Sequence, residues 1–246
     1  MHGKVRTLDV GKITALSMEM DQNGQRSPCT THFINIAGFG YSSHAVYALS
    51  KSYLVKVLAG GFVYWLYGLL TKLFYYSALN VVCTVKGWLP MPPPSENPHA
   101  LENGMDEATQ DGEEKSHDKE MLVPRVEMGA ICNARYFGGN MLIAPHADPT
   151  DGLLDVLMTN DISLIRAVRH VMPGVKDGTL LQRLGPEHCQ TFRCTDLHVA
   201  LAQEDGCKKR IMYVDADGEC AGVGPAQFSI IKQALNVVLP QDIQFD

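Results

Sequence analysis

Residues 131–156 read Ile131-Cys-Asn-Ala-Arg-Tyr-Phe-Gly-Gly-Asn-Met-Leu-Ile-Ala-Pro-His-Ala-Asp-Pro-Thr-Asp-Gly-Leu-Leu-Asp-Val156. This stretch places a strand, a double-glycine turn, a second short strand and an acidic loop in immediate succession, which is typical of a scaffold that holds a polar loop. Far downstream, Tyr213-Val-Asp-Ala-Asp-Gly-Glu-Cys220 puts a second acidic turn at the end of a strand. We therefore expect two loops that carry carboxylates to converge once the strands pair.

The composition is that of an ordinary soluble globular protein. The chain has 246 residues, of which 46% are hydrophobic and 20% charged, enough to bury a core and form one or two domains. The net charge of −6 is concentrated in Glu96–Glu120, where nine acids stand against two lysines, so the remainder is close to neutral. Since a nucleic-acid binder needs a basic stripe to displace counterions from phosphates, we expect no nucleic-acid partner.

The sequence predicts an intracellular, cytoplasmic protein. Residues 1–12 contain no apolar segment of the secretory type. Seven cysteines, with no Cys-x-x-Cys pair, favour free thiols in a reducing compartment over disulfides or zinc. The most apolar run, Tyr53–Leu70, has only 15 uncharged residues between Lys56 and Lys72, fewer than the roughly 20 that a membrane span needs. We interpret it as a buried or interfacial helix.

The pattern of apolar residues predicts a mainly β fold with inserted helices, of the α+β class. Short, partly alternating runs typical of strands recur along the chain. They are His32–Ile36, Leu79–Val85, Arg125–Cys132, Leu153–Met158, Leu197–Leu201, Arg210–Val214 and Leu235–Leu239. Helical patterns cover Ser43–Val57 with its continuation to Phe74, and Ile162–Met172, which ends before Pro173-Gly174.

Residues 90–122 form the clearest irregular segment. A proline-rich start and an acidic, nearly aromatic-free tract cannot bury enough apolar area to offset the entropy of ordering, which predicts a disordered loop. Its flanks, Leu79–Trp88 and Val123–Cys132, have the pattern of two strands of one hairpin. We therefore treat residues 1–246 as one domain with an acidic insertion at 90–122.

The loop Asp148-Pro-Thr-Asp151-Gly-Leu-Leu-Asp155 has two interpretations. Carboxylates three residues apart around a proline turn can direct oxygens at one hard cation such as Mg²⁺ or Ca²⁺. Asp, Pro, Thr and Gly are also the residues of any tight turn. The spacing alone leaves both interpretations open.

The second acidic turn contains Asp215, Asp217 and Glu219. Gly218 allows a backbone conformation that points Glu219 away from the strand, where its carboxylate could orient or deprotonate a hydroxyl group. A solvated hairpin tip is the alternative. Arg166, Arg169 and Lys176 are interpreted as a solvated helix face.

Five segments in this order resemble the diacylglycerol kinase catalytic-domain family, which includes sphingoid-base, ceramide and bacterial lipid kinases. They are Arg6–Gly11, Phe33–Gly40, Asn133–Gly139, Ile143–Val156 and Asp217–Glu219. The resemblance implies the second, β-sandwich-like domain of a two-domain kinase in which an N-terminal domain binds ATP. The family's Gly-Gly-Asp-Gly-Thr nucleotide motif does not occur in these 246 residues. ATP is therefore expected only with that further domain, and no activity is expected from this chain alone.

The resemblance also implies site residues. It places a structural Mg²⁺ on Asp148, Asp151 and the main-chain oxygen of Leu153, and makes Glu219 the base toward the lipid hydroxyl. It places Asp217 and Ser42 at the substrate. Many relatives carry an aspartate where this chain has Ser42.

The leading hypothesis is therefore the lipid-substrate domain of an ATP-dependent lipid kinase, acting on a sphingoid base or diacylglycerol. Its expected partners are the lipid, a peripheral membrane surface and a second copy of the chain in a homodimer. A non-catalytic lipid-binding or regulatory module is the second hypothesis. Kinship with the NAD kinases is the third.

Overall fold

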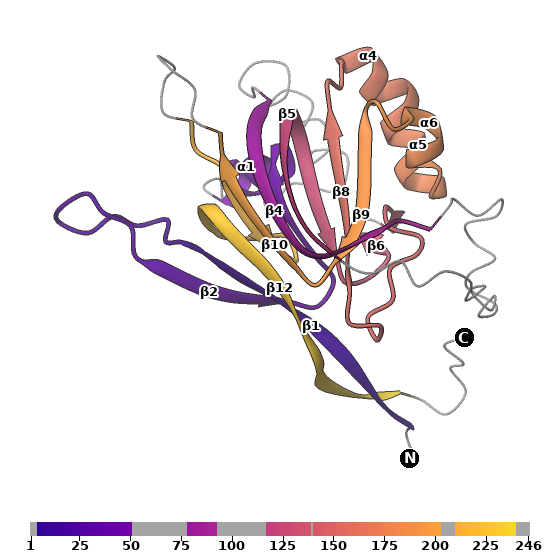
Figure 1. The fold of residues 1–246 in the computed structure, drawn as a ribbon, viewed down its shortest axis with the longest axis horizontal. Helices are drawn as coiled ribbons and strands as arrows, with labels where there is room; N and C mark the ends of the chain where they lie inside the picture. Colours follow the sequence, from indigo (N-terminus) through magenta and orange to yellow (C-terminus); the bar gives the residue numbers. More distant parts are fainter. Residues whose placement is uncertain (1–3, 51–77, 93–116, 139, 203–209, 240–246) are drawn as a thin grey trace.

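The computed structural model describes residues 4–50, 78–92, 117–138, 140–202 and 210–239. Most of them lie in one antiparallel sheet with the strand order β10-β4-β9-β8-β5-β3-β11-β12-β1-β2 (Figure 1). Further pairings, β10 with β12 and β4 with β5, join separate parts of this order, so that the sheet folds over its own core. The predicted fold class, mainly β with inserted helices and sandwich-like, is confirmed.

Several strands extend well beyond the runs seen in the sequence, but the predicted strand His32–Ile36 is interrupted at residues 34–35, and the one predicted at Arg210–Val214 begins only at Tyr213. Their bounds are β1 Lys4–Leu16, β2 Pro28–Phe33, β3 Ile36–Gly40, β4 Leu79–Pro90, β5 His117–Cys132, β6 Tyr136–Phe137, β7 Met141–Leu142, β8 Leu154–Asn160, β9 Cys189–Cys194, β10 Asp196–Leu201, β11 Tyr213–Ala216 and β12 Glu219–Leu239. β6 and β7 form a small separate hairpin. The helical segments are α1 Tyr41–Ser50, α4 Leu164–Arg166, the π-helical turn η2 Ala167–Val171, α5 Met172–Asp177 and α6 Leu180–Leu184.

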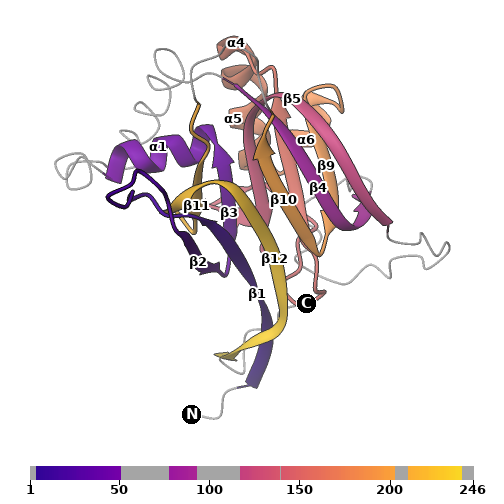
Figure 2. The ribbon, with the colours of Figure 1, turned by 60° about the vertical axis from the view of Figure 1, so that its left-hand side comes forward.

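β1 and β12 form a long two-stranded ribbon that reaches the ends of the described chain (Figures 1 and 2). Their register runs from Lys4↔Leu239 to Leu16↔Val223. Between Leu8 and Val10 the partner strand contains extra residues, which form a β-bulge opposite Asp9. This bulge positions part of the candidate site described below.

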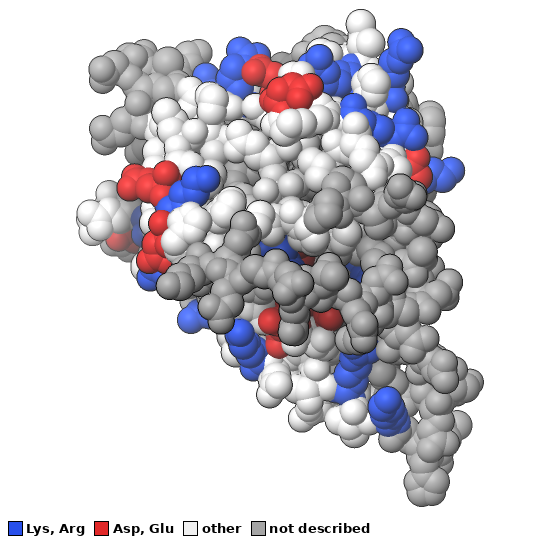
Figure 3. Space-filling model, turned by 45° about the vertical axis from the view of Figure 1, so that its right-hand side comes forward, with Lys and Arg blue, Asp and Glu red and all other residues white. Residues whose placement is uncertain are grey.

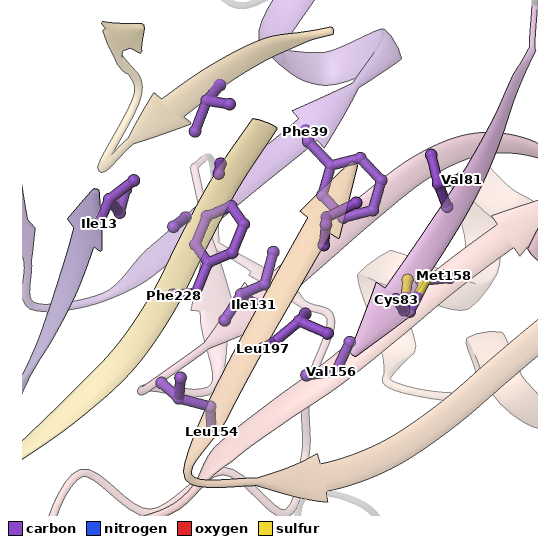
Figure 4. Close-up of a cluster of buried hydrophobic side chains, with 14 of the residues drawn as sticks. Ile13, Phe39, Val81, Cys83, Ile131, Leu154, Val156, Met158, Leu197 and Phe228 are labelled. Atoms are coloured by element: carbon purple, nitrogen blue, oxygen red, sulfur yellow. The ribbon is translucent and has the colours of Figure 1, made fainter. Parts of the chain in front are cut away.

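The core consists of two apolar clusters. The larger lies inside the folded sheet and contains Phe39, Phe228, Ile131 and Leu197, all with under 2% of their surface exposed (Figure 4). The Phe39 and Phe228 rings lie 6.5 Å apart between centroids. The smaller cluster lies between the sheet and α4–α6. One part of the sheet therefore packs against other strands of the same sheet, and another part packs against helices α4–α6.

The predicted hairpin around the acidic insertion is confirmed, with a correction to its boundary. β4 and β5 pair antiparallel from Leu79↔Val126 to Trp88↔His117, and Lys119 lies 4.7 Å above the Trp88 ring centroid. Residues 117–122 are therefore paired strand, and the boundary predicted at 122 is too late. In the paired strand, backbone N–H and C=O groups of this acidic segment bond to β4 instead of to water. Residues 93–116 lie outside the described part of the chain.

The helix predicted to end at Met172 continues to Asp177. Pro173 lies in the first turn of α5, directly after the π-helical turn η2. A proline inside a continuous helix lacks the N–H for one helical bond, and the wider π-helical turn directly before Pro173 is where this helix accommodates that loss. The helix ends instead at Gly178, which has a left-handed φ of 74°.

The helix predicted from Ser43 is confirmed as α1, which lies over β3 and β11 (Figure 2). Its predicted continuation to Phe74 and the apolar run Tyr53–Leu70 lie outside the described residues. Within the described ranges, every helix is too short or too polar to span a lipid bilayer. The six described cysteines are free thiols, and four of them are buried, in agreement with the sequence-based expectation.

Candidate functional site

The acidic loop at 148–153 is held by its own hydrogen bonds. The Asp148 carboxylate accepts through Oδ1 from the main chain of Thr150 at 2.9 Å and from its hydroxyl at 2.6 Å. Oδ1 of Asp151 accepts from the amide of Leu153 at 2.9 Å. These are the Asx-turn bonds that an aspartate makes two residues ahead of itself. The turn interpretation is therefore correct for the backbone, and it places both carboxylates on one short loop.

Asp9, a residue of β1, fastens this loop to the ribbon. Its side chain is 1% exposed, and Oδ2 accepts from the amide of Gly152 at 2.7 Å. Oδ1 accepts from the amide of Gln233 at 2.7 Å, inside the β12 bulge. The amide of Asp9 in turn donates to the Pro149 oxygen at 2.7 Å. One buried carboxylate therefore connects β1, β12 and the acidic loop.

Arg193 faces the loop from β9. Its guanidinium forms an ion pair with Asp151, and its Nε lies 3.2 Å from Oδ1 of Asp155. Asp155 is only 2% exposed, and burial raises its pKa to about 7, with Arg193 opposing that rise and Asp151 and Asp148 adding to it. Burial also raises the pKa of Asp151. Two carboxylates, those of Asp151 and Asp155, thus share one arginine, and Asp148 lies close enough to raise the pKa of both.

The close approach of these carboxylates is the observation that favours a bound cation. Oδ2 of Asp148 accepts no hydrogen bond from the described residues, and carboxylate and main-chain oxygens are the ligands that Mg²⁺ prefers. Within the described part of the chain, no group of three His, Cys, Asp or Glu side chains has the geometry of a metal site. The donor chemistry fits the expected set of Asp148, Asp151 and the Leu153 oxygen, provided that Asp151 exchanges Arg193 for the ion. The metal remains a prediction.

We expect Mg²⁺ to raise the melting temperature of the protein, and the Asp148→Ala, Asp151→Ala double variant to lose that dependence. At about 100 times the Kd, a ligand that binds only the folded state adds about 3 kcal/mol to the unfolding free energy. Thermal unfolding with and without Mg²⁺ measures this effect. The matched control is Glu19→Ala with Glu120→Ala, which removes two exposed carboxylates elsewhere. A parent protein indifferent to Mg²⁺ would show that the assignment is wrong.

The second acidic turn is built by Asp217. Its carboxylate accepts from three consecutive amides, those of Ile34 at 2.8 Å and of Asn35 and Ile36 at 3.0 Å each. Its own amide donates to the Ile36 oxygen at 2.9 Å. Asp217 therefore ties the β11–β12 turn to the β2–β3 connection. In this structure, both of its carboxylate oxygens are used by the protein itself.

Glu219 follows at the start of β12. Gly218 has a φ of +82°, a conformation that side-chain-bearing residues rarely adopt, and this turns the chain so that Glu219 is exposed. The Glu219 carboxylate makes no hydrogen bond or ion pair with the described residues. It is therefore a carboxylate on a rigid turn that is available to a ligand.

Asn133 links the two acidic loops. Its side-chain amide donates to the main-chain oxygen of Asp9 at 3.1 Å and to that of Ile34 at 2.7 Å. Asp9 holds the first loop, and Asp217 holds the turn at Ile34. The predicted convergence of the two acidic loops takes the form of a connection through the buried side chain of Asn133. This side chain binds the segments that hold each loop.

Ser42 lies close to the second turn, beside a buried pair that sequence reasoning did not find. Asp215 and Ser43 are each 1% exposed, and the Ser43 hydroxyl donates to Oδ1 of Asp215 at 2.5 Å. A Cβ built on Gly38 would lie 2.8 Å from Oδ1 of Asp215 and 3.3 Å from the Ser42 hydroxyl. Gly38 therefore leaves room for both polar groups at the start of α1.

Burial raises the pKa of Asp215 to about 6, with Ser43 and the Gly218 main chain opposing the rise and Asp217 adding to it. The folded state then binds more protons than the unfolded state between about pH 4 and pH 6, so stability falls as the pH rises through that window. We expect Asp215→Asn to remove this loss, which is about 3 kcal/mol for a shift of about two units. Urea unfolding at pH 4, 5, 6 and 7 measures it. The asparagine oxygen can still accept from Ser43, so an unchanged pH dependence would contradict the proposed titration.

The enclosed space near the first loop is small. A cavity of about 40 Å³ lies beside Asp155 and is lined mainly by apolar side chains of the β7–β8 connection and α6. A pocket for a drug-sized ligand usually measures 300 to 1,000 Å³. This cavity is therefore too small for an acyl chain.

Sequence reasoning identified the two acidic turns but missed the residues that hold them. Asp9 lies on β1, Arg193 on β9 and Asn133 directly after β5, and none belongs to a local motif with an evident role. Asp9 and Asn133 did lie within segments that carried the family resemblance. Their burial by partners distant in sequence became apparent only in the fold.

The fold and its paired loops define a β-sandwich-like domain with an exposed carboxylate on a fixed turn. Residues 103–239 match the model of the YegS C-terminal NAD kinase beta sandwich-like domain. The chain belongs to this family, and the resemblance to the diacylglycerol kinase catalytic-domain family is confirmed.

Individual relatives agree with this assignment. The chain is 30% identical over 122 residues to the diacylglycerol kinases of two Mycobacterium tuberculosis strains, CDC 1551 and H37Rv, covering 50% of this chain and 36% of each relative. A crystal structure from Bacillus anthracis strain Sterne, described provisionally as a diacylglycerol kinase, superimposes with a TM-score of 0.54 at 16% identity. It covers 98% of this chain and 60% of the other. The chain thus spans about a third of the length of the curated relatives.

Proposed function

We propose that this chain is the lipid-substrate domain of an ATP-dependent lipid kinase that phosphorylates a lipid hydroxyl group. The observation that carries the proposal is Glu219, an exposed and unpaired carboxylate on a turn that Asp217 fixes with three amide bonds. Phosphoryl transfer depends on positioning and on charge stabilisation, with a carboxylate to orient the nucleophile. The geometry of this turn meets that requirement.

In the proposed reaction, Glu219 accepts a hydrogen bond from the lipid hydroxyl and takes its proton as the oxygen attacks the γ-phosphorus of ATP. The bond from that phosphorus to the bridging oxygen breaks, and ADP leaves. The nucleotide would be held by a further domain of the kind that the longer relatives have room for. Ser42 would contact the lipid head group. Mg²⁺ on the acidic loop would neutralise its crowded carboxylates and stabilise the loop.

The lipid is a diacylglycerol or a sphingoid base. The name of the Mycobacterium relatives supports diacylglycerol as the first candidate. Ser42 supplies a neutral hydroxyl where many relatives carry an acid, which weakens the case for a cationic sphingoid head group. Buried Asp215 beside it is already bonded to Ser43.

A fusion tests the proposal. The nucleotide-binding domain of the Mycobacterium diacylglycerol kinase is joined ahead of Lys4, and labelled ATP is supplied with vesicles that carry diacylglycerol or sphingosine. We expect labelled phospholipid from one of the two lipids. Lipid binding without transfer, from a fusion that binds ATP, would instead support the non-catalytic lipid-binding module.

A further inference from the structure

The helical segment 164–177 has an inner face that the core already uses. Val175 is buried, and Ala167 and Val171 pack against the smaller apolar cluster beneath it. An amphipathic helix of a globular protein normally directs one apolar face to the core and polar residues to solvent. The inner face follows this rule.

The outer face does not follow it. Ile165, Val168 and Met172 are 79%, 51% and 39% exposed, respectively. Their spacings of three and four residues place them in one stripe along the continuous helical segment formed by α4, η2 and α5. Single exposed apolar residues need no explanation, but a contiguous stripe marks a surface that binds something. We call these three residues the outer stripe.

Positive charge flanks the outer stripe. Arg169 and Lys176 are exposed and form no ion pair with the described residues. The one acid of the segment, Asp177, is paired with Arg183 at 2.7 Å. Lys and Arg side chains lie along the upper edge of the molecule, at the height where α4 lies, with a group of acidic side chains among them (Figures 1 and 3). The exposed Arg169 and Lys176 therefore give the surface beside the outer stripe a positive charge, in a chain whose net charge is −6.

We propose that the outer stripe docks this domain on an anionic lipid surface. A narrow apolar stripe bordered by long basic side chains is the pattern of a helix that lies in the membrane interface, with the stripe in the acyl boundary and the cations at the head groups. Each Lys or Arg near such a surface strengthens binding about fivefold. The inference goes beyond the proposed function, because it concerns the membrane and needs no phosphoryl transfer.

Vesicle co-sedimentation tests it with the chain as it exists. Vesicles are made of phosphatidylcholine alone or of phosphatidylcholine with phosphatidylserine. We expect the parent to bind the anionic vesicles more tightly, with an affinity that falls as salt rises. Ile165→Glu with Val168→Glu should weaken binding by at least about tenfold, because it removes two inserted apolar side chains and adds repulsion. Arg169→Gln with Lys176→Gln should remove most of the preference for anionic vesicles.

The matched control is Met20→Glu with Val238→Glu, which makes the same charge change at exposed apolar sites outside helices α4–α6. It should bind as the parent does, and thermal unfolding should show that all variants fold. The proposal is overturned if the glutamate stripe variant binds like the control, or if the parent does not distinguish the two vesicle types. It is also overturned if light scattering shows a dimer that this variant alone makes monomeric. Loss of transfer in the kinase fusion would leave these vesicle results unchanged, so the two proposals can fail separately.

Discussion

Glu219→Gln should lower the rate of phosphoryl transfer by the fused kinase by about 10²- to 10⁴-fold, the usual contribution of a general base. Glutamine keeps the size of the side chain and can still accept a hydrogen bond, but it cannot take the proton of the attacking hydroxyl. The measurement is the initial rate of labelled phospholipid formation at saturating ATP. Lipid binding should change little, because only the step of proton removal is affected.

The structure provides controls for this experiment. The Glu219 side chain is exposed and bonds to none of the described residues, so its replacement should leave the thermal midpoint unchanged. Glu120→Gln alters an exposed glutamate far along β5 and should keep full activity. Asp217→Asn should behave differently, lowering both activity and the thermal midpoint, because it disturbs the bonds to Ile34, Asn35 and Ile36. Transfer at the parent rate by Glu219→Gln would exclude the proposed base.

The sequence predicted elements whose information is local. In β4, Val81, Cys83 and Val85 are buried while Thr84 and Lys86 are exposed, and this alternation is visible without a structure. The glycine turns and the Asp-Gly-Glu tip are equally local. Such features are determined by a few neighbouring residues. For this reason, the hairpin around the insertion and the fold class could be predicted from the sequence.

Elements that depend on distant partners were missed. β1 has few strongly apolar residues, and most of β12 before Leu235 breaks alternation with glycine, proline and adjacent isoleucines. Each strand is stable because it pairs with the other across more than 200 residues of sequence. Pro173 was misjudged for a related reason. The π-helical turn before it, which no local rule predicts, lets the helix continue.

The candidate site shows the same division. Asp148, Asp151, Asp217 and Glu219 were candidates from the sequence, because they lie in loops of turn residues and in segments that carry the family resemblance. The network that joins those loops includes Asn133, whose two acceptors lie about 100 or more residues away in sequence. A buried polar side chain of this kind is costly unless it is hydrogen-bonded, and only the fold shows that the side-chain N–H groups of Asn133 find two acceptors.

Asp9→Ala should therefore be strongly destabilising, by about 3 kcal/mol. The alanine leaves the amides of Gly152 and Gln233 without their acceptor, and each buried unsatisfied donor costs about 1 to 3 kcal/mol. The Gly152 amide lies in a buried position, whereas that of Gln233 is only partly buried, so we expect less than the sum of two full penalties. Urea unfolding measures the loss. Hydrogen exchange should show the Gly152 amide losing its protection.

Asp21→Ala is the matched control. Asp21 also accepts from two backbone amides, those of Asn23 at 2.9 Å and Gln25 at 2.7 Å, but it lies in an exposed turn where water can replace the lost acceptor. We expect this change to cost no more than about 1 kcal/mol. Equal losses for the two variants would show that Asp9 acts as an ordinary turn residue. A larger loss for Asp9→Ala, together with loss of the Mg²⁺ dependence of stability, would show that the β1–β12 ribbon holds the acidic loop in the form that binds the ion.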